Sequence, residues 1–530
     1  MKNDSGMASY PQLLHNAFLG IELGSTRIKS VLIDGDHRIL ATGNHDWENR
    51  LEDGIWTYSL EDVWIGLRSS FSSLAAQVLE RYGIKLKTVG RICISAMMHG
   101  YLPFSNENGL LVPFRTWRNT NTADASMKLS ESLGFNIPLR WSAAHYYQAL
   151  MNGEDHCSKV SFITTLSGYV HWKLTGLQVI GVGDASGMFP AGLDGFDIGM
   201  LDEFNRLCSE FGSEAPITMP KVLFAGDDAG SLTVEGALLL DPSGNLCSGI
   251  PFCPPEGDAG TGMVATNSIT ERTGNVSAGT SVFAMIVLDR KLQGAYPEID
   301  IVATPDGKPV AMVHCNNCTS DIDAWVKLLV DFMETAGVAS AISNVYDLLY
   351  ASALKGDPNC GGLLSYNYLS GEPITKFDEG RPMLARLPDS KFNFPNLSRS
   401  LLFSAIATLR IGMDILVTEE GVNTELLYGH GGYFKVSAAG QNLMAAALNL
   451  PIIVYESAGE GGAWGAALLA AYASQKSKDE SLSEYLSNRV FSEMKSISAI
   501  PDANDVAGFN EYLKAYIRGL EIEREAVKSF

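Results

Sequence analysis

The stretch FLGIELGSTRIKSVLID, residues 18–34, places two apolar runs on either side of the small-residue turn GST at 24–26. Runs of this composition bounded by turn residues predict two β-strands joined by a turn. Gly35 and Asp36 supply the next turn, and HRILATGNHDWE after them predicts a third strand. The chain therefore opens as a meander of strands.

A related arrangement opens the second half of the chain, where residues 275–289 read NVSAGTSVFAMIVLD. A strand again leads into a small-residue turn, at 279–281, and a strong apolar strand follows. One supersecondary unit is therefore predicted to occur twice. Segments with apolar residues at three- and four-residue spacing, such as 60–83 and 398–421, predict helices between further strands. Alternating β and α elements predict an α/β protein with helix-covered sheets.

The length of 530 residues exceeds what one core usually supports, so we expect two large domains. Residues 1–17 are predicted to be an N-terminal leader, 18–270 a first domain and 271–530 a second domain. The boundary near residue 270 rests on the polar turn residues of SITERTG. The charged C-terminal tail from about residue 474 predicts packing helices without chemistry of their own.

The net charge of −21 argues against nucleic acid or an anionic membrane surface as the main partner, because both select for basic patches. The longest apolar runs are shorter than the ~18 to 20 residues that span a bilayer, and no apolar signal segment precedes the first strand. These features predict a cytoplasmic protein. The eight scattered cysteines favour free thiols in a reducing compartment.

His314, Cys315 and Cys318 form the one suggestive cysteine cluster, since Cys360 has no close companion. We interpret them as small core residues on a strand that runs into a helix. A redox-sensitive thiol pair and a metal site are the alternatives, although a single CxxC pair does not make a zinc site.

The two small-residue turns are candidate phosphate-binding sites, because backbone N–H groups and hydroxyls of such turns can approach phosphate oxygens closely. Lys29 on the following strand would add positive charge. Ordinary hairpin chemistry is the alternative for either turn alone. Neither turn has the pattern of a P-loop or of a dinucleotide-binding fold, so those two solutions are disfavoured.

Asp258 lies in the glycine-rich segment PEGDAGTGMVA, 255–265, which can bring a carboxylate up to a ligand. In phosphoryl transfer to an alcohol, such a group would accept the hydroxyl proton as a general base. A cap on a helix or turn is the alternative.

Four further segments have residues suited to ligand contact, each with ordinary packing or loop structure as the alternative. The loop SAMMHG ends a strand with Met98 and His99. FRTWRNTN at 114–121 combines an aromatic side chain with planar donors, the equipment of sugar recognition. YGHGG at 428–432 and EGGAWGAA at 460–467 would permit close approach of a flat base to the backbone.

In combination and in order, these motifs resemble those of the FGGY carbohydrate kinases over nearly the whole chain. IELGSTRIKSVLID and SAGTS resemble the two phosphate motifs, SAMMHG the sugar loop, and GDAGTGM the catalytic loop. LTG with DASGMF, NYLSGEPIT, GHGGYFKVSAAGQ and EGGAWGAALLAAY supply the remaining matches.

The resemblance implies a two-domain actin-like ATPase (ribonuclease H-like) α/β fold with an interdomain catalytic cleft, sugar on the first domain and ATP on the second. It implies ATP and Mg²⁺ as cofactors and a small-molecule sugar as the other partner. Resembling kinases are commonly homodimers, although no segment here identifies an interface. The implied catalytic base is Asp258. The implied sugar-binding residues are Met98, His99, Trp117, Arg118, Asn119 and Asp258. The implied ATP-binding residues are Gly24, Ser25, Thr26, Lys29, Gly279, Thr280, Ser281, Gly431, Gly432 and Gln441. Glu22 and Asp258 would contact Mg²⁺, through water.

Three positions depart from the family pattern. Glu22 replaces the usual aspartate, Trp117-Arg118-Asn119 replaces Trp-Asn-Asp, and the arginine expected after Glu372 is absent. The MHG and tryptophan loops look most like those of xylulokinases, with L-ribulose kinases next. We therefore expect phosphorylation of the terminal hydroxyl of a ketopentose, D-xylulose first and L-ribulose second.

Three alternatives to this function stay open. One is a kinase for another sugar or polyol, and another is a catalytically silent sugar or nucleotide sensor, which Glu22 would favour. The third is an actin-like ATPase with a structural or chaperone role. The MHG and tryptophan loops argue against the third, because a filament or chaperone protein has no use for them.

Overall fold

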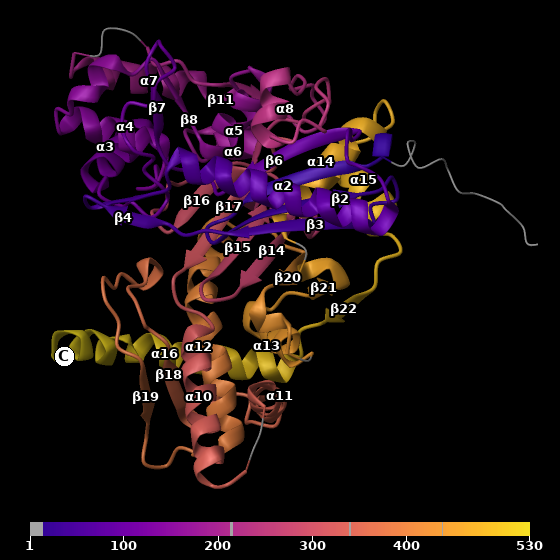
Figure 1. Ribbon diagram of the computed structural model, residues 1–530. Helices are drawn as coiled ribbons and strands as arrows, with labels where there is room; N and C mark the ends of the chain where they lie inside the picture. The colour runs from indigo at the N-terminus through magenta and orange to yellow at the C-terminus, as the bar shows by residue number, and fades with distance from the viewer. Residues whose placement is uncertain (1–13, 213–215, 339–340, 437, 460, 530) are drawn as a thin grey trace, which may run out of the picture. The chain divides into compact units, whose positions relative to one another are not determined.

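The computed structural model describes residues 14–212, 216–338, 341–436, 438–459 and 461–529 (Figure 1). Unit 1 comprises residues 1–269, 301–310 and 460–493, and unit 2 comprises 270–300, 311–459 and 494–530. The first change of unit falls beside the expected boundary at 270, whereas 460–493 returns to unit 1. The limits 18–270 and 271–530 stay a prediction, and residues 1–13 of the expected leader lie outside the described residues.

A five-stranded sheet of order β13-β6-β1-β2-β3 forms the centre of unit 1. β1 pairs antiparallel with β2, and β2 with β3, so the predicted opening meander is confirmed. β6 pairs parallel with β1, and β13 pairs parallel with β6. The five strands are β1 (Phe18–Leu23), β2 (Arg27–Ile33), β3 (Ile39–Asp46), β6 (Arg91–Ala96) and β13 (Glu256–Gly257).

Helices α2 and α14 pack on this sheet. α2 (Leu60–Tyr82) contacts β2 and β3, and it begins where the Ser59 hydroxyl accepts the N–H of Asp62 at 3.0 Å. It ends at Gly83 in the left-handed conformation, as the sequence predicts. α14 (Gly462–Gln475) contacts β1, β6 and the short helix α9 (Asp258–Ala265). A segment from late in the chain therefore completes the core of unit 1.

Shorter strands and helices make up the rest of unit 1. They include β4 (Arg50–Glu52), β5 (Ile55–Thr57), β7 (Leu102–Phe104), α3 (Ala123–Leu133), α4 (Ser142–Met151), β8 (Phe162–Thr164), α5 (Leu166–Thr175), β9 (Val179–Gly181), α6 (Val182–Ala185), α7 (Ile198–Ser209), β12 (Lys221–Leu223), α8 (Val234–Leu240) and α15 (Leu482–Tyr485).

The central sheet of unit 2 has the order β16-β17-β15-β14-β20-β21-β22, although the division into units assigns residues 301–303 of β16 and 309–310 of β17 to unit 1. β14 pairs antiparallel with β15 and parallel with β20, which repeats the arrangement of β1, β2 and β6 and confirms the predicted duplication. The strands are β14 (Thr273–Ala278), β15 (Val282–Val287), β16 (Ile299–Ala303), β17 (Pro309–Cys315), β20 (Leu426–His430), β21 (Ile452–Tyr455) and β22 (Ser496–Ala499).

The long helix α12 (Phe394–Asp414) is the central helix of unit 2 (Figure 1). It contacts α11 (Ile342–Ala353), α13 (Ala439–Leu448), α16 (Ala503–Ser529) and β18 (Leu363–Tyr366), while α10 (Ser320–Thr335) packs beside α11. With its continuation to Glu419, α12 is long and apolar enough to cross a membrane by length and composition, but 67% of the apolar window is buried inside the protein. The sequence analysis considered only uninterrupted apolar runs, so this helix, which charged residues interrupt, did not register there. Burial identifies α12 as a core helix.

Candidate functional site

Three predicted site segments of unit 1 follow the carboxyl ends of neighbouring parallel strands. In the register of the sheet, Leu23 of β1 lies opposite Ala96 of β6, and Ala96 lies opposite Gly257 of β13. The turn 24–26 follows β1, the loop of Met98 follows β6, and Asp258 follows β13. In open α/β sheets the carboxyl ends of parallel strands form the ligand-binding edge, so the fold brings these three segments together.

One residue before these ends, a row of four polar side chains crosses the sheet. Lys29 pairs with Glu22, Glu22 with Ser95, and Ser95 with Glu256 in successive strands. Residues in register point to the same face of a sheet. Lys29 therefore lies beside Glu22, on the strand that follows the turn as the sequence predicted, and its contact with ATP stays a prediction.

Asp258 is the first residue of α9, and its side chain contacts the MHG loop. Its Oδ1 accepts the N–H of Met98 at 3.1 Å and that of Ala259 at 3.0 Å. Burial raises the pKa of Asp258, while these N–H groups and the charge of Arg140 oppose the rise. The carboxylate thus has a capping contact and is also in place beside the MHG loop. The sequence analysis missed Arg140, whose positive charge lowers the pKa of Asp258.

Glu22 uses its extra methylene to reach α14. Its Oε2 accepts the N–H of Ala463 at 3.1 Å, in the first turn of that helix. A methyl group at Gly462 would lie 2.4 Å from Oε1, so glycine is required for this approach. Burial, and then the negative charge of Asp258, raise the pKa of Glu22 to about 7.

The pair Glu22 and Asp258 fits a hard divalent cation. The two carboxylates repel each other in a desolvated place, and a cation would relieve that repulsion. Among the described residues no group of three His, Cys, Asp or Glu side chains could hold a metal. Mg²⁺ typically uses one or two carboxylates and keeps several waters, so the donor set suits that ion.

His99 is held in a strained backbone conformation with a φ of 71°. Its Nδ1 lies 3.1 Å from the carbonyl oxygen of Gly187, which belongs to the DASGMF motif. A methyl group at Gly187 would lie 2.7 Å from this nitrogen, and one at Gly257 would lie 2.2 Å from Met98 Cγ. Two glycines of separate motifs therefore make room for the sugar loop.

The tryptophan loop is anchored by Asn119. Its Oδ1 accepts the N–H of Trp56 at 2.9 Å, and its Nδ2 donates to the Trp56 and Thr116 carbonyls at 2.8 and 3.0 Å. Arg118 stacks on Trp56, with its guanidinium carbon 3.5 Å from the ring centroid, and Trp117 is 38% exposed. The structure thus gives Asn119 a structural task, while sugar contact by Trp117, Arg118 and Asn119 stays a prediction.

The turn Gly24-Ser25-Thr26 is fixed by two aromatic residues that the sequence analysis missed. Trp47 donates from Nε1 to the Gly24 carbonyl at 2.7 Å and from its backbone N–H to that of Thr26 at 3.1 Å. The Tyr58 hydroxyl donates to the Ser25 carbonyl at 2.5 Å. The two rings stack with centroids 4.2 Å apart. The turn is therefore preset, and Trp47 was detectable only as part of the expected third strand.

Asp184 and Glu256 form a buried carboxyl pair close to the Asp258 segment. The Thr165 hydroxyl donates to Asp184 Oδ2 at 2.6 Å, the Ser167 hydroxyl donates to the same atom, and Glu256 accepts the Asp184 N–H at 3.2 Å. Burial raises the pKa of Asp184 to about 7 and that of Glu256 well above its usual range. Asp184 was visible in the DASGMF motif, whereas Glu256 gave no signal of its own.

Asp184→Asn is expected to change the pH dependence of stability. The folded protein keeps the Asp184 proton up to about pH 7, whereas the unfolded chain releases it near pH 4, so this group makes the free energy of unfolding fall between those values. Relative to the wild type, the variant should gain roughly 4 kcal/mol between pH 4 and pH 8. Urea unfolding at both pH values measures the difference. If the free energy of unfolding changed equally with pH in the two proteins, Asp184 would not be protonated in the folded state.

In unit 2 the ends of β14 and β20 bring two predicted ATP-binding segments together. Ser277 lies in register with His430, so the turn 279–281 and the glycines after β20 leave the sheet side by side. Gly431 has a φ of 101°, and a methyl group there would lie 2.4 Å from the Ala278 carbonyl oxygen. A methyl group at Gly279 or Gly432 would meet nothing within 4 Å, so both glycines border open space.

Gln441 lies beneath this region and is 2% exposed. Its Nε2 donates to the Phe434 carbonyl at 3.2 Å, so the structure shows it supporting the segment after Gly432. A direct contact of Gln441 with ATP stays a prediction.

Cys315 and Cys318 are buried core residues at the end of β17 and before α10, as the sequence suggested. All eight cysteines are free thiols.

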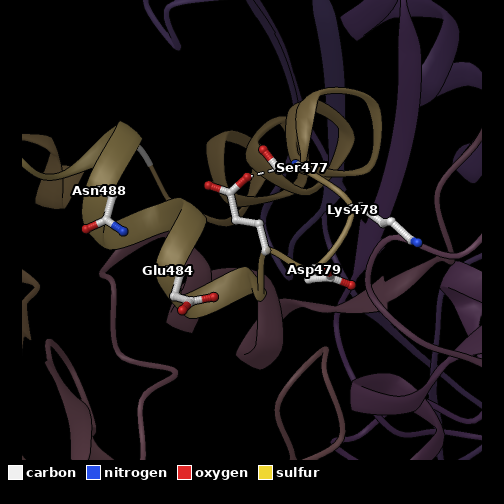
Figure 2. Close-up of a pocket in the computed structure, with 6 residues that line it drawn as sticks. Ser477, Lys478, Asp479, Glu484 and Asn488 are labelled. Carbon is white, nitrogen blue, oxygen red and sulfur yellow. Dashed lines mark hydrogen bonds between the residues drawn. The ribbon is translucent and has the colours of Figure 1, made fainter.

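A separate surface hollow of about 460 Å³ occurs in unit 1 (Figure 2). It is lined by Ser477, Lys478, Asp479, Glu480, Glu484 and Asn488. The Glu480 carboxylate accepts the Ser477 N–H at 2.9 Å and pairs with Arg489. None of the predicted site residues lines this hollow.

Known proteins resemble the chain over nearly its full length. It is 23% identical over 484 residues to a xylulose kinase of Haemophilus influenzae, covering 88% of this chain and 92% of that protein. The xylulose kinase structure from Rhodospirillum rubrum matches with a TM-score of 0.77 at 16% identity, over 95% of this chain and 98% of that one. The Plasmodium falciparum glycerol kinase structure with ADP gives 0.74 at 15% identity, over 95% and 98%.

These matches confirm the predicted two-domain actin-like α/β fold. The models of the N-terminal and C-terminal domains of the FGGY family of carbohydrate kinases match residues 17–258 and 274–474. Together the two matched ranges span most of the chain. The protein therefore belongs to the FGGY family of carbohydrate kinases, which are phosphotransferases with a hydroxyl acceptor.

Proposed function

We propose that the protein is an ATP-dependent kinase that phosphorylates the terminal hydroxyl of a ketopentose, with D-xylulose as the favoured acceptor and L-ribulose second. The observation that carries the proposal is the hydrogen bond from the Met98 N–H to Asp258 Oδ1 at 3.1 Å. It joins the proposed base to the loop proposed to contact the sugar. The xylulose kinase relative that spans 88% of the chain supports D-xylulose. We place the enzyme in the cytoplasm, where ATP and free sugars are available.

Asp258 would accept the proton of the attacking sugar hydroxyl. Burial raises the pKa of this group, so its carboxylate is a stronger base than an exposed aspartate. His99, fixed by its contact with Gly187, would orient the sugar through hydroxyl groups. Arg118, with its plane set by Trp56, would supply further donors in place of the family's neutral amide.

Glu22 and Asp258 would hold Mg²⁺ through water, and the bound ion would neutralise charge on the transferring phosphoryl group. The turns 24–26 and 279–281 would bind phosphate oxygens of ATP through backbone N–H groups and hydroxyls. Gly431 and Gly432 would admit the flat adenine base close to the backbone. This chain supplies positioning and electrostatics, which is what phosphoryl transfer chiefly requires.

A coupled ADP-release assay with Mg·ATP tests this proposal. The acceptors to compare are D-xylulose, L-ribulose, D-ribulose, L-xylulose, glycerol and gluconate, with kcat/KM as the readout. We expect D-xylulose to give the highest value, with L-ribulose next. A kcat/KM for glycerol or gluconate higher than that for every ketopentose would contradict the proposed acceptor, but it would still agree with a kinase.

A further inference from the structure

Glu372 is a fully buried carboxylate that the mechanism above does not use. Its Oε2 accepts the backbone N–H groups of Asn316 and Asn317 at 3.0 and 3.3 Å, and the Asn317 side-chain amide at 3.3 Å. Glu372 thereby holds the segment that follows β17. A buried carboxylate is retained only when such donors compensate its desolvation.

Asn317 adds further hydrogen bonds between the 316–319 segment and the residues before Glu372. It is 4% exposed, and its Oδ1 accepts the N–H groups of Leu369 and Ser370, both at 3.0 Å. Asn367 donates from Nδ2 to the Cys318 carbonyl at 3.2 Å. Residues of the NYLSGEPIT motif are therefore hydrogen-bonded to Asn316, Asn317 and Cys318 of the 316–319 segment.

The 316–319 segment is in turn hydrogen-bonded to the turn 279–281 of unit 2. The Thr319 N–H and hydroxyl donate to the Gly279 carbonyl at 3.0 and 2.8 Å, and the Cys318 N–H donates to the Thr280 carbonyl at 3.0 Å. Hydrogen bonds therefore hold the 316–319 segment to Glu372 at Asn316 and Asn317, and the next two residues of the same segment bind the Gly279 and Thr280 carbonyls of the turn. The Gly279 N–H donates to the Ser281 carbonyl within the turn at 2.9 Å, so these contacts together hold the turn and its remaining donors in one orientation.

We infer that Glu372 and Asn317 are positioning residues for the nucleotide, which preset the 279–281 turn through the 316–319 segment. The inference rests on the proposed ATP-binding role of that turn. It gives Glu372 and Asn367 of the NYLSGEPIT motif a common task in holding the 316–319 segment. It also assigns Thr319 as the last link to the turn.

The test compares four variants of the full chain by titration calorimetry with Mg·ADP. Glu372→Ala removes the acceptor and strands the N–H groups of Asn316 and Asn317, so it should weaken Mg·ADP binding about tenfold or more. Glu372→Gln keeps one acceptor oxygen and should stay near the wild-type affinity. Burial raises the pKa of Glu372 to about 7, so a neutral amide suits the site. Thr319→Val removes only the hydroxyl link and should weaken binding by a smaller factor.

Glu420→Ala is the matched control. Glu420 is also a buried carboxylate of unit 2 that accepts backbone N–H groups, those of Gln293 and Gly294 at 2.8 to 3.0 Å. These two residues follow the C-terminal end of β15, whereas the turn 279–281 precedes its N-terminal end. Glu372→Ala and Glu420→Ala should both lower the melting temperature, and only Glu372→Ala should weaken Mg·ADP binding.

Unchanged Mg·ADP affinity in both Glu372→Ala and Thr319→Val would overturn the inference while the wild type still binds the nucleotide. Equal weakening by Glu420→Ala would overturn it as well, because the effect would then be general destabilisation. A wild-type protein that binds no Mg·ADP would instead contradict the proposed function, and the inference with it. If Glu372→Ala does not fold, Thr319→Val against Glu420→Ala decides the question.

Discussion

Asp258→Asn is expected to lower kcat by a factor of about 10² to 10⁴ while sugar binding changes little. The amide keeps the size of the side chain and an oxygen that can accept the Met98 N–H, so the loop geometry should survive. It cannot accept the proton of the attacking hydroxyl. Steady-state kinetics with Mg·ATP and D-xylulose, together with calorimetry of D-xylulose alone, measure the two effects.

Asp36→Asn serves as the control, because Asp36 is an exposed aspartate of a surface turn and pairs only with Arg38 among the ion pairs of the described residues. It should leave kcat unchanged. An Asp258→Asn enzyme with near-normal kcat would show that Asp258 is not the base. A variant that loses sugar binding to the same extent as kcat would instead assign Asp258 a binding role.

Gly465→Ala should cause the largest loss of stability of the substitutions considered. A methyl group at this position would lie 1.9 Å from the Thr261 carbonyl oxygen, in the contact between α14 and α9. Both partners are backbone in buried helices, so the helices would have to separate. We expect a loss of about 3 kcal/mol or more in the free energy of unfolding.

Gly262→Ala is the matched control, since Gly262 lies in α9 and a methyl group there would meet nothing within 4 Å. Alanine in a helix interior should leave stability unchanged or raise it by about 0.5–1 kcal/mol. Chemical denaturation of both variants at one pH gives the comparison. Equal stability of Gly465→Ala and wild type would contradict the close packing of α14 on α9.

The sequence was sufficient to predict both strand-turn-strand units and the helix that ends at Gly83. Their signals are local, since apolar strands, small-residue turns and a glycine C-cap each lie within one short window. The return of 460–493 to unit 1 could not be predicted in this way. It depends on packing between α14 and β1, elements separated by more than four hundred residues.

The sequence placed the candidate residues Asp258, Met98 and His99 in loops, and the parallel pairing of β6 with β13 brings these loops together. The partners that fix them were not predictable. Glu22 reaches the Ala463 N–H across the fold, and Trp47 with Tyr58 fixes the first turn from outside any recognised motif. Such contacts depend on side-chain direction in the assembled sheet, which composition and spacing do not encode.

Mass spectrometry of the products formed from Mg·ATP and D-xylulose tests the central claim most directly. We predict a pentulose that carries one added phosphoryl group, formed in equal amount to ADP and only when the ketose is present. ADP and inorganic phosphate released at the same rate with or without the sugar, and no phosphorylated pentulose, would contradict it.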